Sequence, residues 1–379
     1  MDRRIGRKLK NPGFDIILFS VTYILIIIGI IMVFSSSAII AQERYNNMYF
    51  FVFRQSIWVV IGVFSFILGL NTDYKKWAKF SRPGIFLIII LLAAVLMPFI
   101  GHSVGGARRW IRFAGIGFQP AELAKVVVII YMASILDRKF SKIGTFYKDL
   151  LPPLLLVMLI VFLIYMQPDF GTSALIITSA GAMLFLGGVK TKHLLIGALM
   201  FLPFMIYAAV SFGYRRERLL SFLKPFENMY DSGFQLSHSI VALGDGGMRG
   251  VGLGAGYQKL FFIPEVHTDF VFAVIGQELG IIGSYCVLIL FSLFAWRGIK
   301  IALNQKEYLG RVMAAGLTFL ISIQAIINIG VVTGCLPTKG LSLPFVSFGG
   351  SSLLFNMFAV GVILNISKKR EKVLRKVRR

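Results

Sequence analysis

The chain has 379 residues, of which 57% are hydrophobic and only 15% are charged, and its mean hydropathy is +0.78. A soluble protein of this size could not bury so much apolar surface, so the composition excludes an ordinary globular domain and predicts a polytopic membrane protein. The formal net charge of +23 does not indicate nucleic-acid binding, because lysine and arginine cluster in short connections between apolar runs.

Ten apolar runs of membrane-spanning length follow a basic tail at residues 1–12. We expect transmembrane helices near residues 14–40, 50–70, 84–100, 120–136, 151–167, 170–188, 194–212, 269–296, 311–332 and 350–367. The predicted fold is therefore one all-α polytopic membrane domain over residues 1–379. An even number of spans puts both termini on the same side of the membrane.

The basic residues indicate which side that is. Residues 1–12, 71–83, 137–150, 189–193, 297–311 and 368–379 together hold 27 of the 40 lysine and arginine residues. Basic residues in short loops near helix ends favour the cytoplasm. We therefore expect both termini, including the basic tail at residues 368–379, to be cytoplasmic.

Ten of the remaining 13 basic residues fall in three loops that this topology places outside the cytoplasm. The loop at residues 101–120 carries Arg108, Arg109 and Arg112, and the loop at residues 333–349 carries Lys339. The longest loop, residues 213–268, joins the seventh and eighth spans. Long loops without secondary structure are uncommon unless functional, so we expect short helices over Arg215–Phe226 and Ser237–Leu243.

Arg109 follows Gly105 and Gly106 and precedes Trp110. A guanidinium group binds phosphate oxygens in pairs, and a tryptophan suits the level of the lipid headgroups. This combination favours a diphosphate lipid as ligand, and the alternative is contact with the headgroups of anionic membrane lipids.

Three acidic or basic residues lie at the mouths of spans. Glu122 and Lys125 are three residues apart, which places them on one helix face where they can pair, either as a structural ion pair or as part of a site. Asp169 lies in a tight turn between two spans and is predicted to be the N-cap of the second.

Glycines are dense between Gly250 and Gly256. The pattern superficially resembles a dinucleotide-binding loop, but no strand precedes it, and we reject that interpretation. The segment is either a backbone that approaches a ligand closely or a flexible lid or simple loop.

Asp269 stands where the longest loop enters the eighth span, and a carboxylate there loses hydration. Glu265, His267 and Asp269 could bind a metal, although three ligands from one peptide are a weak signal. A carboxylate in a partly apolar cleft could instead accept a proton from a hydroxyl group. Alternatively, Asp269 caps the eighth span together with Thr268.

Five motifs give the chain a resemblance to the SEDS family of membrane proteins, which includes FtsW, RodA and SpoVE. The motifs are GGARRWI at 105–111, FQPAELAK at 118–125, QPDFGT at 167–172, GLGAGYQKLFFIPEVHTDFVFAVIGQELG at 252–280 and PTKGLSLPFVSFGGSSLL at 337–354. The Pro337–Gly340 segment and the Phe14–Asp15 pair resemble the FtsW/SpoVE branch. Val266 and Gln277 replace the alanine and glutamate that are frequent in relatives.

The resemblance implies a peptidoglycan glycosyltransferase that polymerises lipid II into β-1,4 glycan strands on the outer face of the cytoplasmic membrane, in cell division or cell-shape synthesis. It implies a class B penicillin-binding protein as transpeptidase partner, together with other divisome or elongasome proteins. Asp269 matches the essential aspartate of the family, Glu122 and Lys125 its conserved pair, and Arg109 its conserved arginine.

We therefore expect Asp269 to be the catalytic base. The expected substrate-binding residues are Arg109, Glu122, Lys125, Arg215, His267 and Lys339. The sequence identifies no cofactor, although a divalent cation, Mg²⁺ or Mn²⁺, could help to stabilise the diphosphate. One rival hypothesis is a lipid II flippase, for which a polar path through the membrane is expected. The other is a scaffold that only recruits the transpeptidase.

Overall fold

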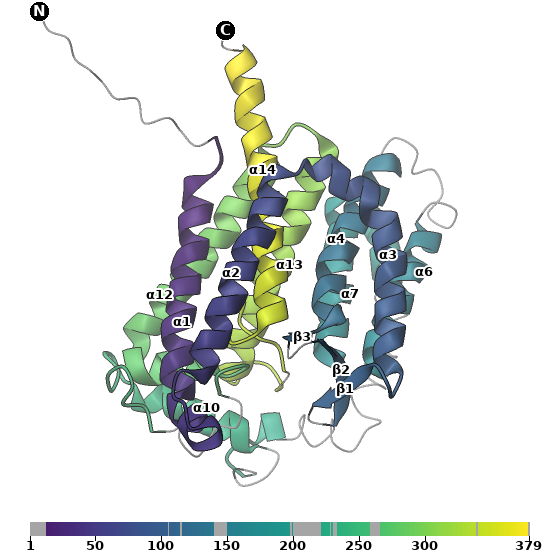
Figure 1. Cartoon of the computed structure of the whole chain (residues 1–379). Helices are drawn as coiled ribbons and strands as arrows, with labels where there is room; N and C mark the ends of the chain where they lie inside the picture. Colours follow the sequence, from purple (N-terminus) through teal and green to yellow (C-terminus); the bar gives the residue numbers. More distant parts are fainter. Residues whose placement is uncertain are drawn as a thin grey trace, which may run out of the picture.

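The computed structural model describes residues 13–104, 106–113, 116–139, 150–197, 199, 221–227, 229, 233–257, 266–338 and 340–377. Its helices are α1 (Ile16–Tyr45), α2 (Phe50–Asn71), α3 (Tyr74–Leu96), α4 (Pro120–Lys139), α6 (Leu151–Met166), α7 (Phe170–Leu186), α10 (Phe234–Asp245), α12 (Val271–Leu303), α13 (Tyr308–Val332) and α14 (Gly350–Val377). Three short strands, β1 (Gly101–Val104), β2 (Ala107–Phe113) and β3 (Ile116–Phe118), complete it (Figure 1).

Nine of the ten predicted spans overlap one of these helices, while the seventh, at residues 194–212, lies largely outside the described residues. Among the described helices, α1, α2, α3, α12, α13 and residues Gly350–Lys368 of α14 are long and apolar enough to cross a membrane, and α6 and α7 are shorter apolar helices. The chain is a multi-pass membrane protein. The predicted helix Ser237–Leu243 is confirmed by α10, whereas residues 215–220, half of the predicted helix Arg215–Phe226, lie outside the described residues.

Helices extend into segments that the sequence analysis treated as connections. The predicted third span started at residue 84, but α3 starts at Tyr74, where the Oδ1 atom of Asp73 accepts a hydrogen bond of 2.9 Å from the Lys75 amide. Similarly, α14 continues to Val377 through the predicted basic tail. The predicted ends were placed where charge begins, but lysine and arginine are good helix formers.

The expectation of an all-α fold is wrong at one place. The three strands form an antiparallel sheet in the order β1-β2-β3. Gly106 makes the first turn with φ = 79°, a conformation that glycine adopts without strain. The side chains of β2 alternate, so that Arg108 and Arg112 are exposed while Ala107 is buried. The alternation of exposed and buried residues extends over too few positions to predict a strand between two apolar spans.

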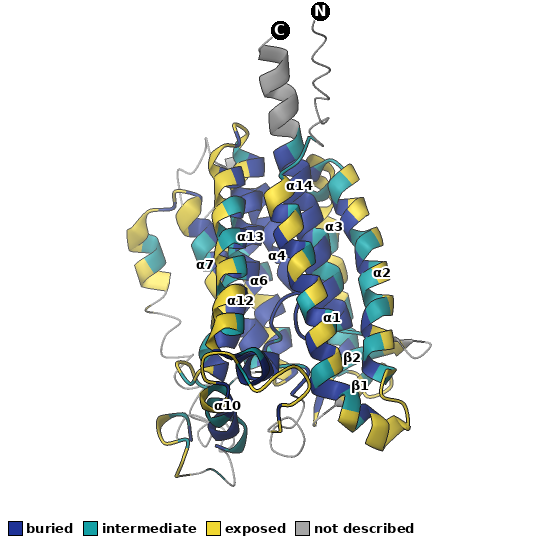
Figure 2. Ribbon diagram, turned by 90° about the vertical axis from the view of Figure 1, so that its left-hand side faces the viewer, coloured by how far each residue is buried: buried dark blue, intermediate teal, exposed yellow. Residues whose placement is uncertain are grey.

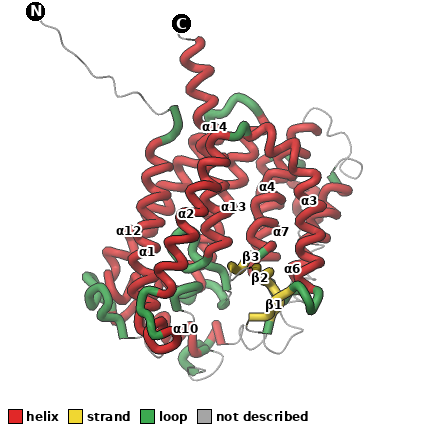
Figure 3. Tube along the Cα trace, viewed as in Figure 1, coloured by secondary structure: helices red, strands yellow, loops and turns green. Residues whose placement is uncertain are grey.

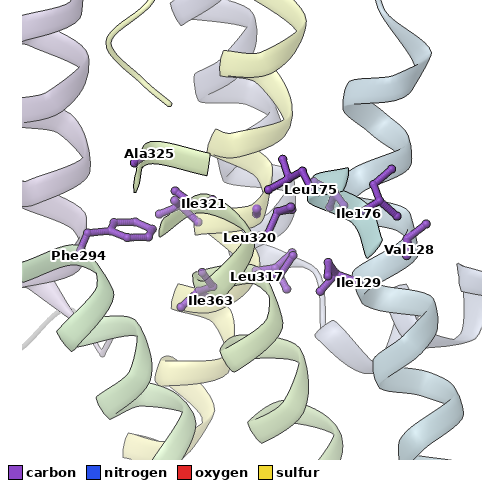
Figure 4. Packing of buried hydrophobic residues seen from close by; sticks show 14 of the residues in the cluster. Val128, Ile129, Leu175, Ile176, Phe294, Leu317, Leu320, Ile321, Ala325 and Ile363 are labelled. Atoms are coloured by element: carbon purple, nitrogen blue, oxygen red, sulfur yellow. The ribbon is translucent and has the colours of Figure 1, made fainter. Parts of the chain in front are cut away.

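Helix α13 lies at the centre of the bundle. Leu317, Leu320 and Ile321 of α13 pack between α4, α7, α12 and α14, and each is 2% exposed or less (Figure 4). Large apolar side chains on the outer helices are exposed, for example Phe64 of α2 at 69% and Ile282 of α12 at 62% (Figure 2). Outward-facing apolar surface of this extent fits a lipid environment.

The bundle has two distinct ends (Figure 3). At the first, called the termini face, α1 begins and α14 leaves the bundle, and the Asp15 amide donates to Ser367 Oγ at 3.2 Å. Asp15 also forms an ion pair with Arg297 of α12. At the opposite end, called the loop face, lie the sheet, α10 and the connections into α7, α12 and α14 (Figure 1). The candidate site residues that the structure describes gather at the loop face.

Candidate active site

Asp269 lies in the turn that leads into α12. The helix begins at Val271, and its N-cap residue is Phe270, which makes no side-chain capping bond. Asp269 is therefore not the N-cap of this helix. Asp269 is partly exposed. Its carboxylate lies close to Gly340, because a Cβ atom added to that glycine would be only 2.9 Å from Asp269 Oδ2. Two loops far apart in the sequence thus meet at this carboxylate.

Asn328 of α13 joins these two loops. Its side chain is buried, and its Nδ2 atom donates to the Asp269 carbonyl at 2.8 Å and to the Leu341 carbonyl at 2.6 Å. An amide NH₂ group has two hydrogens, so each can serve one acceptor. The main chain at Asp269 is thereby tied to the main chain beside Gly340.

Gln324 lies one turn earlier on α13, on the same helix face as Asn328. Its Nε2 atom donates to the Ser342 carbonyl at 2.9 Å, and its Oε1 atom accepts a hydrogen bond of 2.8 Å from Lys125 Nζ. Gln324 and Asn328 were not among the site residues expected from the sequence. The available signal was two amides spaced i, i+4 within an apolar span, because polar groups at that depth require partners.

Glu122 and Lys125 form an ion pair on the first turns of α4, as their spacing allowed. Lys125 Nζ lies 2.8 Å from Glu122 Oε2, and the two side chains are 2% and 9% exposed. The Lys125 ammonium thus contacts both Glu122 and Gln324. Each buried charge is compensated by the other, which is the condition under which such a pair is tolerated.

Arg109 connects the sheet to the turn between α6 and α7. Its Nε atom donates to the Gln167 carbonyl at 3.0 Å, and its Nη2 atom donates to the Pro168 carbonyl at 2.6 Å. In the same turn, Asp169 is the N-cap of α7, with its Oδ1 atom accepting from the Thr172 amide at 3.1 Å, which confirms the predicted cap. The arginine therefore holds β2 beside a firmly capped helix.

His267 is buried beside the candidate base. Its ring centroid lies 4.5 Å from that of Phe51 and 5.5 Å from that of Phe348, and its carbonyl accepts a hydrogen bond of 2.9 Å from the Phe348 amide. These contacts fix the segment that precedes Asp269 against α2 and the start of α14.

The glycine-rich segment packs against a bend in α12. The helix bends at Gly280, where φ is 67° and ψ is −163°. Main-chain hydrogen bonds cross the bend from Val251 to Gln277 (3.0 Å), from Gly252 to Glu278 (3.0 Å) and from Ile281 to Gly247 (2.9 Å). Residues 246–252 therefore form a packed strap that replaces helical hydrogen bonds, which argues against a flexible lid for this part of the loop.

Glu278 is a further functional candidate that was not expected from the sequence. It is 1% exposed, and Ser35 Oγ of α1 lies 2.7 Å from its Oε1 atom and 2.6 Å from its Oε2 atom. The available signal was a carboxylate inside a predicted span, because such residues are costly and usually have a role.

Three predicted or considered residues lie outside the described residues, namely Arg215, Lys339 and Glu265. Within the described residues, no group of three His, Cys, Asp or Glu side chains is placed to hold a metal ion. The structure thus brings together Asp269, His267, Gly340 and the α13 amides, with Glu122 and Lys125 behind them and Arg109 at the neighbouring turn.

The comparisons with known proteins agree with this architecture. A family model for FtsW, RodA and SpoVE, described as a cell cycle protein, matches residues 15–372. The chain belongs to the FtsW/RodA/SpoVE family. It is 39% identical to a probable peptidoglycan glycosyltransferase FtsW of Geobacter metallireducens, with 94% of this chain and 95% of the relative covered.

The chain is also similar to a sporulation protein and to solved structures. The stage V sporulation protein E of Bacillus subtilis is 39% identical, with 95% of this chain and 98% of the relative covered. A solved structure described as "Structural coordination of polymerization and crosslinking by a peptidoglycan synthase complex" has a TM-score of 0.77 at 28% identity, covering 94% of this chain and 98% of that one. The RodA crystal structure from Thermus thermophilus has a TM-score of 0.70 at 25% identity, with 94% and 97% covered.

Proposed function

We propose that this chain is a peptidoglycan glycosyltransferase that polymerises lipid II, with Asp269 as the catalytic base. Its relatives bear the name peptidoglycan glycosyltransferase, and a similar structure belongs to a peptidoglycan synthase complex. The observation that supports the assignment of the base is geometric. Asp269 is a partly exposed carboxylate at the mouth of the bundle, held in place through its own main chain by Asn328.

The proposed reaction joins two lipid II molecules. Asp269 accepts the proton of the 4-hydroxyl group of the acceptor GlcNAc as that oxygen attacks C1 of the donor MurNAc. The new C1–O bond forms while the C1–O bond to the diphosphate breaks, and undecaprenyl diphosphate leaves with the electron pair. Attack opposite the leaving group inverts the anomeric centre and gives a β-1,4 linkage.

Negative charge increases on the diphosphate as it leaves, so cationic groups near it stabilise the transition state. Arg109, Lys125, Arg215 and Lys339 are proposed for this role, either by direct contact or through the field of the site. Glu122 pairs with Lys125, and His267 shapes the segment before the base by its contacts with Phe51 and Phe348.

The loop face is proposed to be extracytoplasmic, because the short basic connections belong to the termini face. The described part of the loop at residues 213–268, which includes α10, would then lie outside the cytoplasm. The partner proposed for this polymerase is a class B penicillin-binding protein, because the solved complex described above couples polymerization to crosslinking.

The test uses the purified protein with its transpeptidase partner and fluorescently labelled lipid II in detergent, with glycan chains separated by gel electrophoresis. Polymer from the wild-type complex supports the proposed activity. Absence of polymer, together with lipid II translocation in vesicles that contain the protein, would replace the polymerase by a flippase. Absence of both activities would leave the scaffold hypothesis.

A further inference from the structure

Two amides of α13 connect the buried ion pair to the proposed base. The connection runs from Glu122 to Lys125 (2.8 Å) and from Lys125 to Gln324 (2.8 Å). It reaches the adjacent carbonyls of Ser342 and Leu341 through Gln324 (2.9 Å) and Asn328 (2.6 Å), and Asn328 also binds the Asp269 carbonyl (2.8 Å). Two helices, α4 and α13, and the two loops at Asp269 and at residues 341–342 are thus joined by one chain of hydrogen bonds.

We propose that Asn328 is a positioning residue for glycosyl transfer. Gln324 has a related role, because it links the Glu122–Lys125 pair to the loop at residues 340–342 and so makes the position of that loop depend on the pair. Asn328 does not reach the carboxylate of Asp269; it holds the carbonyl of that residue and the carbonyl of Leu341. It thereby fixes the distance between the Asp269 carboxylate and the turn at Gly340. This inference rests on the proposed function, since it assumes that Asp269 acts as the base.

The side chains of this hydrogen-bond chain are buried, so water cannot replace a lost partner. Gln324, Asn328 and Lys125 are each 1% or 2% exposed, so loss of a donor leaves a carbonyl without its partner in a dry environment, which is costly. Asn328 Oδ1 has no hydrogen-bond partner among the described residues. The amide therefore acts here only as a double donor, and this function is lost when the NH₂ group is replaced by an oxygen.

The same chain of hydrogen bonds gives Lys125 a role that needs no contact with substrate. Its ammonium is engaged by Glu122 and Gln324, and Gln324 in turn holds Ser342. Removal of Lys125 would then act on the reaction through the position of the loop at residues 340–342. A direct diphosphate contact would instead stabilise the leaving diphosphate itself, and its loss would lower kcat independently of Gln324 and of that loop.

The principal test compares Asn328→Asp with wild type, because aspartate keeps the volume of asparagine and removes both donors. Asn365→Asp is the matched control: Asn365 is also buried, and it also ties two segments, donating to the Leu70 carbonyl at 2.7 Å and accepting from the Tyr74 amide at 3.2 Å, but it lies at the termini face. Both variants are purified with the transpeptidase partner and assayed with labelled lipid II.

We expect Asn328→Asp to lower kcat by about 100-fold, since a misplacement of about 1 Å can cost that much, and to change KM by less than about threefold. Asn365→Asp should destabilise the protein similarly in thermal unfolding while retaining kcat. The proposal is overturned if Asn328→Asp retains wild-type kcat, if its defect is wholly in KM, or if the control loses kcat equally. Wild-type polymer with none from Asp269→Asn supports the proposed function whichever of these occurs.

A second test addresses Gln324 without relying on Asn328. The test is a double-mutant cycle of Lys125→Met and Gln324→Leu. If the two residues act through one chain of hydrogen bonds, the kcat of the double variant should be close to that of the less active single variant. Losses in kcat that multiply in the double variant would show that the two residues act independently, and would contradict the indirect role of the lysine.

Discussion

Gly340 and Asp269 lie so close that a Cβ atom at position 340 would be 2.9 Å from Asp269 Oδ2. Apart from residue 340 and its two chain neighbours, Asp269 Oδ2 is the only heavy atom of the described residues within 3.4 Å of that Cβ position, so the contact concerns the carboxylate itself. Because the end of a side chain can shift more easily than a backbone, an added methyl group would move the carboxylate rather than unfold the protein.

Gly340→Ala is therefore expected to lower kcat by about tenfold or more while changing the free energy of unfolding by less than about 1 kcal/mol. Gly349→Ala in the same loop is the control, because its Cβ would meet only Ser352 Cβ, at an ordinary 3.6 Å. Glycan synthesis and thermal unfolding are measured for both. Equal activity of the two alanine variants would contradict the close approach to the base.

Removal of one member of the Glu122–Lys125 pair should destabilise the protein strongly. Glu122→Gln leaves a buried ammonium without its counter-charge, and such changes cost about 3–5 kcal/mol. The pair Lys224–Glu227 has the same i, i+3 spacing, but its side chains are 65% and 66% exposed, so Glu227→Gln should cost less than about 1 kcal/mol. Thermal unfolding in detergent compares the two, and equal losses would show that burial does not decide the effect.

Gly280→Ala should disrupt the bend in α12. The added Cβ would lie 2.4 Å from the Gly250 nitrogen and 2.7 Å from the Met248 carbonyl, at a φ of 67° that alanine rarely adopts. We expect a loss of about 1–3 kcal/mol or more from backbone strain. Gly181→Ala in α7, where a Cβ meets nothing within 4 Å, should be neutral or stabilising. An unchanged melting temperature for Gly280→Ala would be inconsistent with the packed strap.

Arg109→Lys should reduce stability, because lysine cannot reproduce the two hydrogen bonds to the Gln167 and Pro168 carbonyls. The expected cost is about 2 kcal/mol, typical of hydrogen bonds from a charged donor. Arg112→Lys, at an exposed position of the same strand, is the control. A higher KM for lipid II with unchanged thermal stability would assign Arg109 to substrate binding alone.

The spans and some helix ends could be predicted because they depend on local signals. Apolar length predicts α1 or α13, and Asp169 before Phe170 predicts a cap without any knowledge of the neighbouring helices. The i, i+3 spacing of Glu122 and Lys125 likewise predicts that they can pair, since both residues belong to one helix.

What the sequence did not predict depends on contacts between distant segments. The bend at Gly280 exists because residues 246–252 replace helical hydrogen bonds, and Asn328 matters because Asp269 and Leu341 reach it from different loops. A glycine or an amide in an apolar span has several possible partners, and only the tertiary fold decides among them. The local pattern therefore located Asp269 but not the residues that hold it.

The most direct test of the proposed mechanism is the single-turnover rate of polymerisation by the Asp269→Asn variant in complex with its transpeptidase partner. Asparagine keeps the size of the side chain and cannot accept the proton as a carboxylate does, so the rate should fall by about 10²–10⁴-fold, while labelled lipid II still binds and the protein unfolds at the wild-type temperature. A folded Asp269→Asn variant that forms glycan chains at the wild-type rate would contradict the assignment of Asp269 as the base.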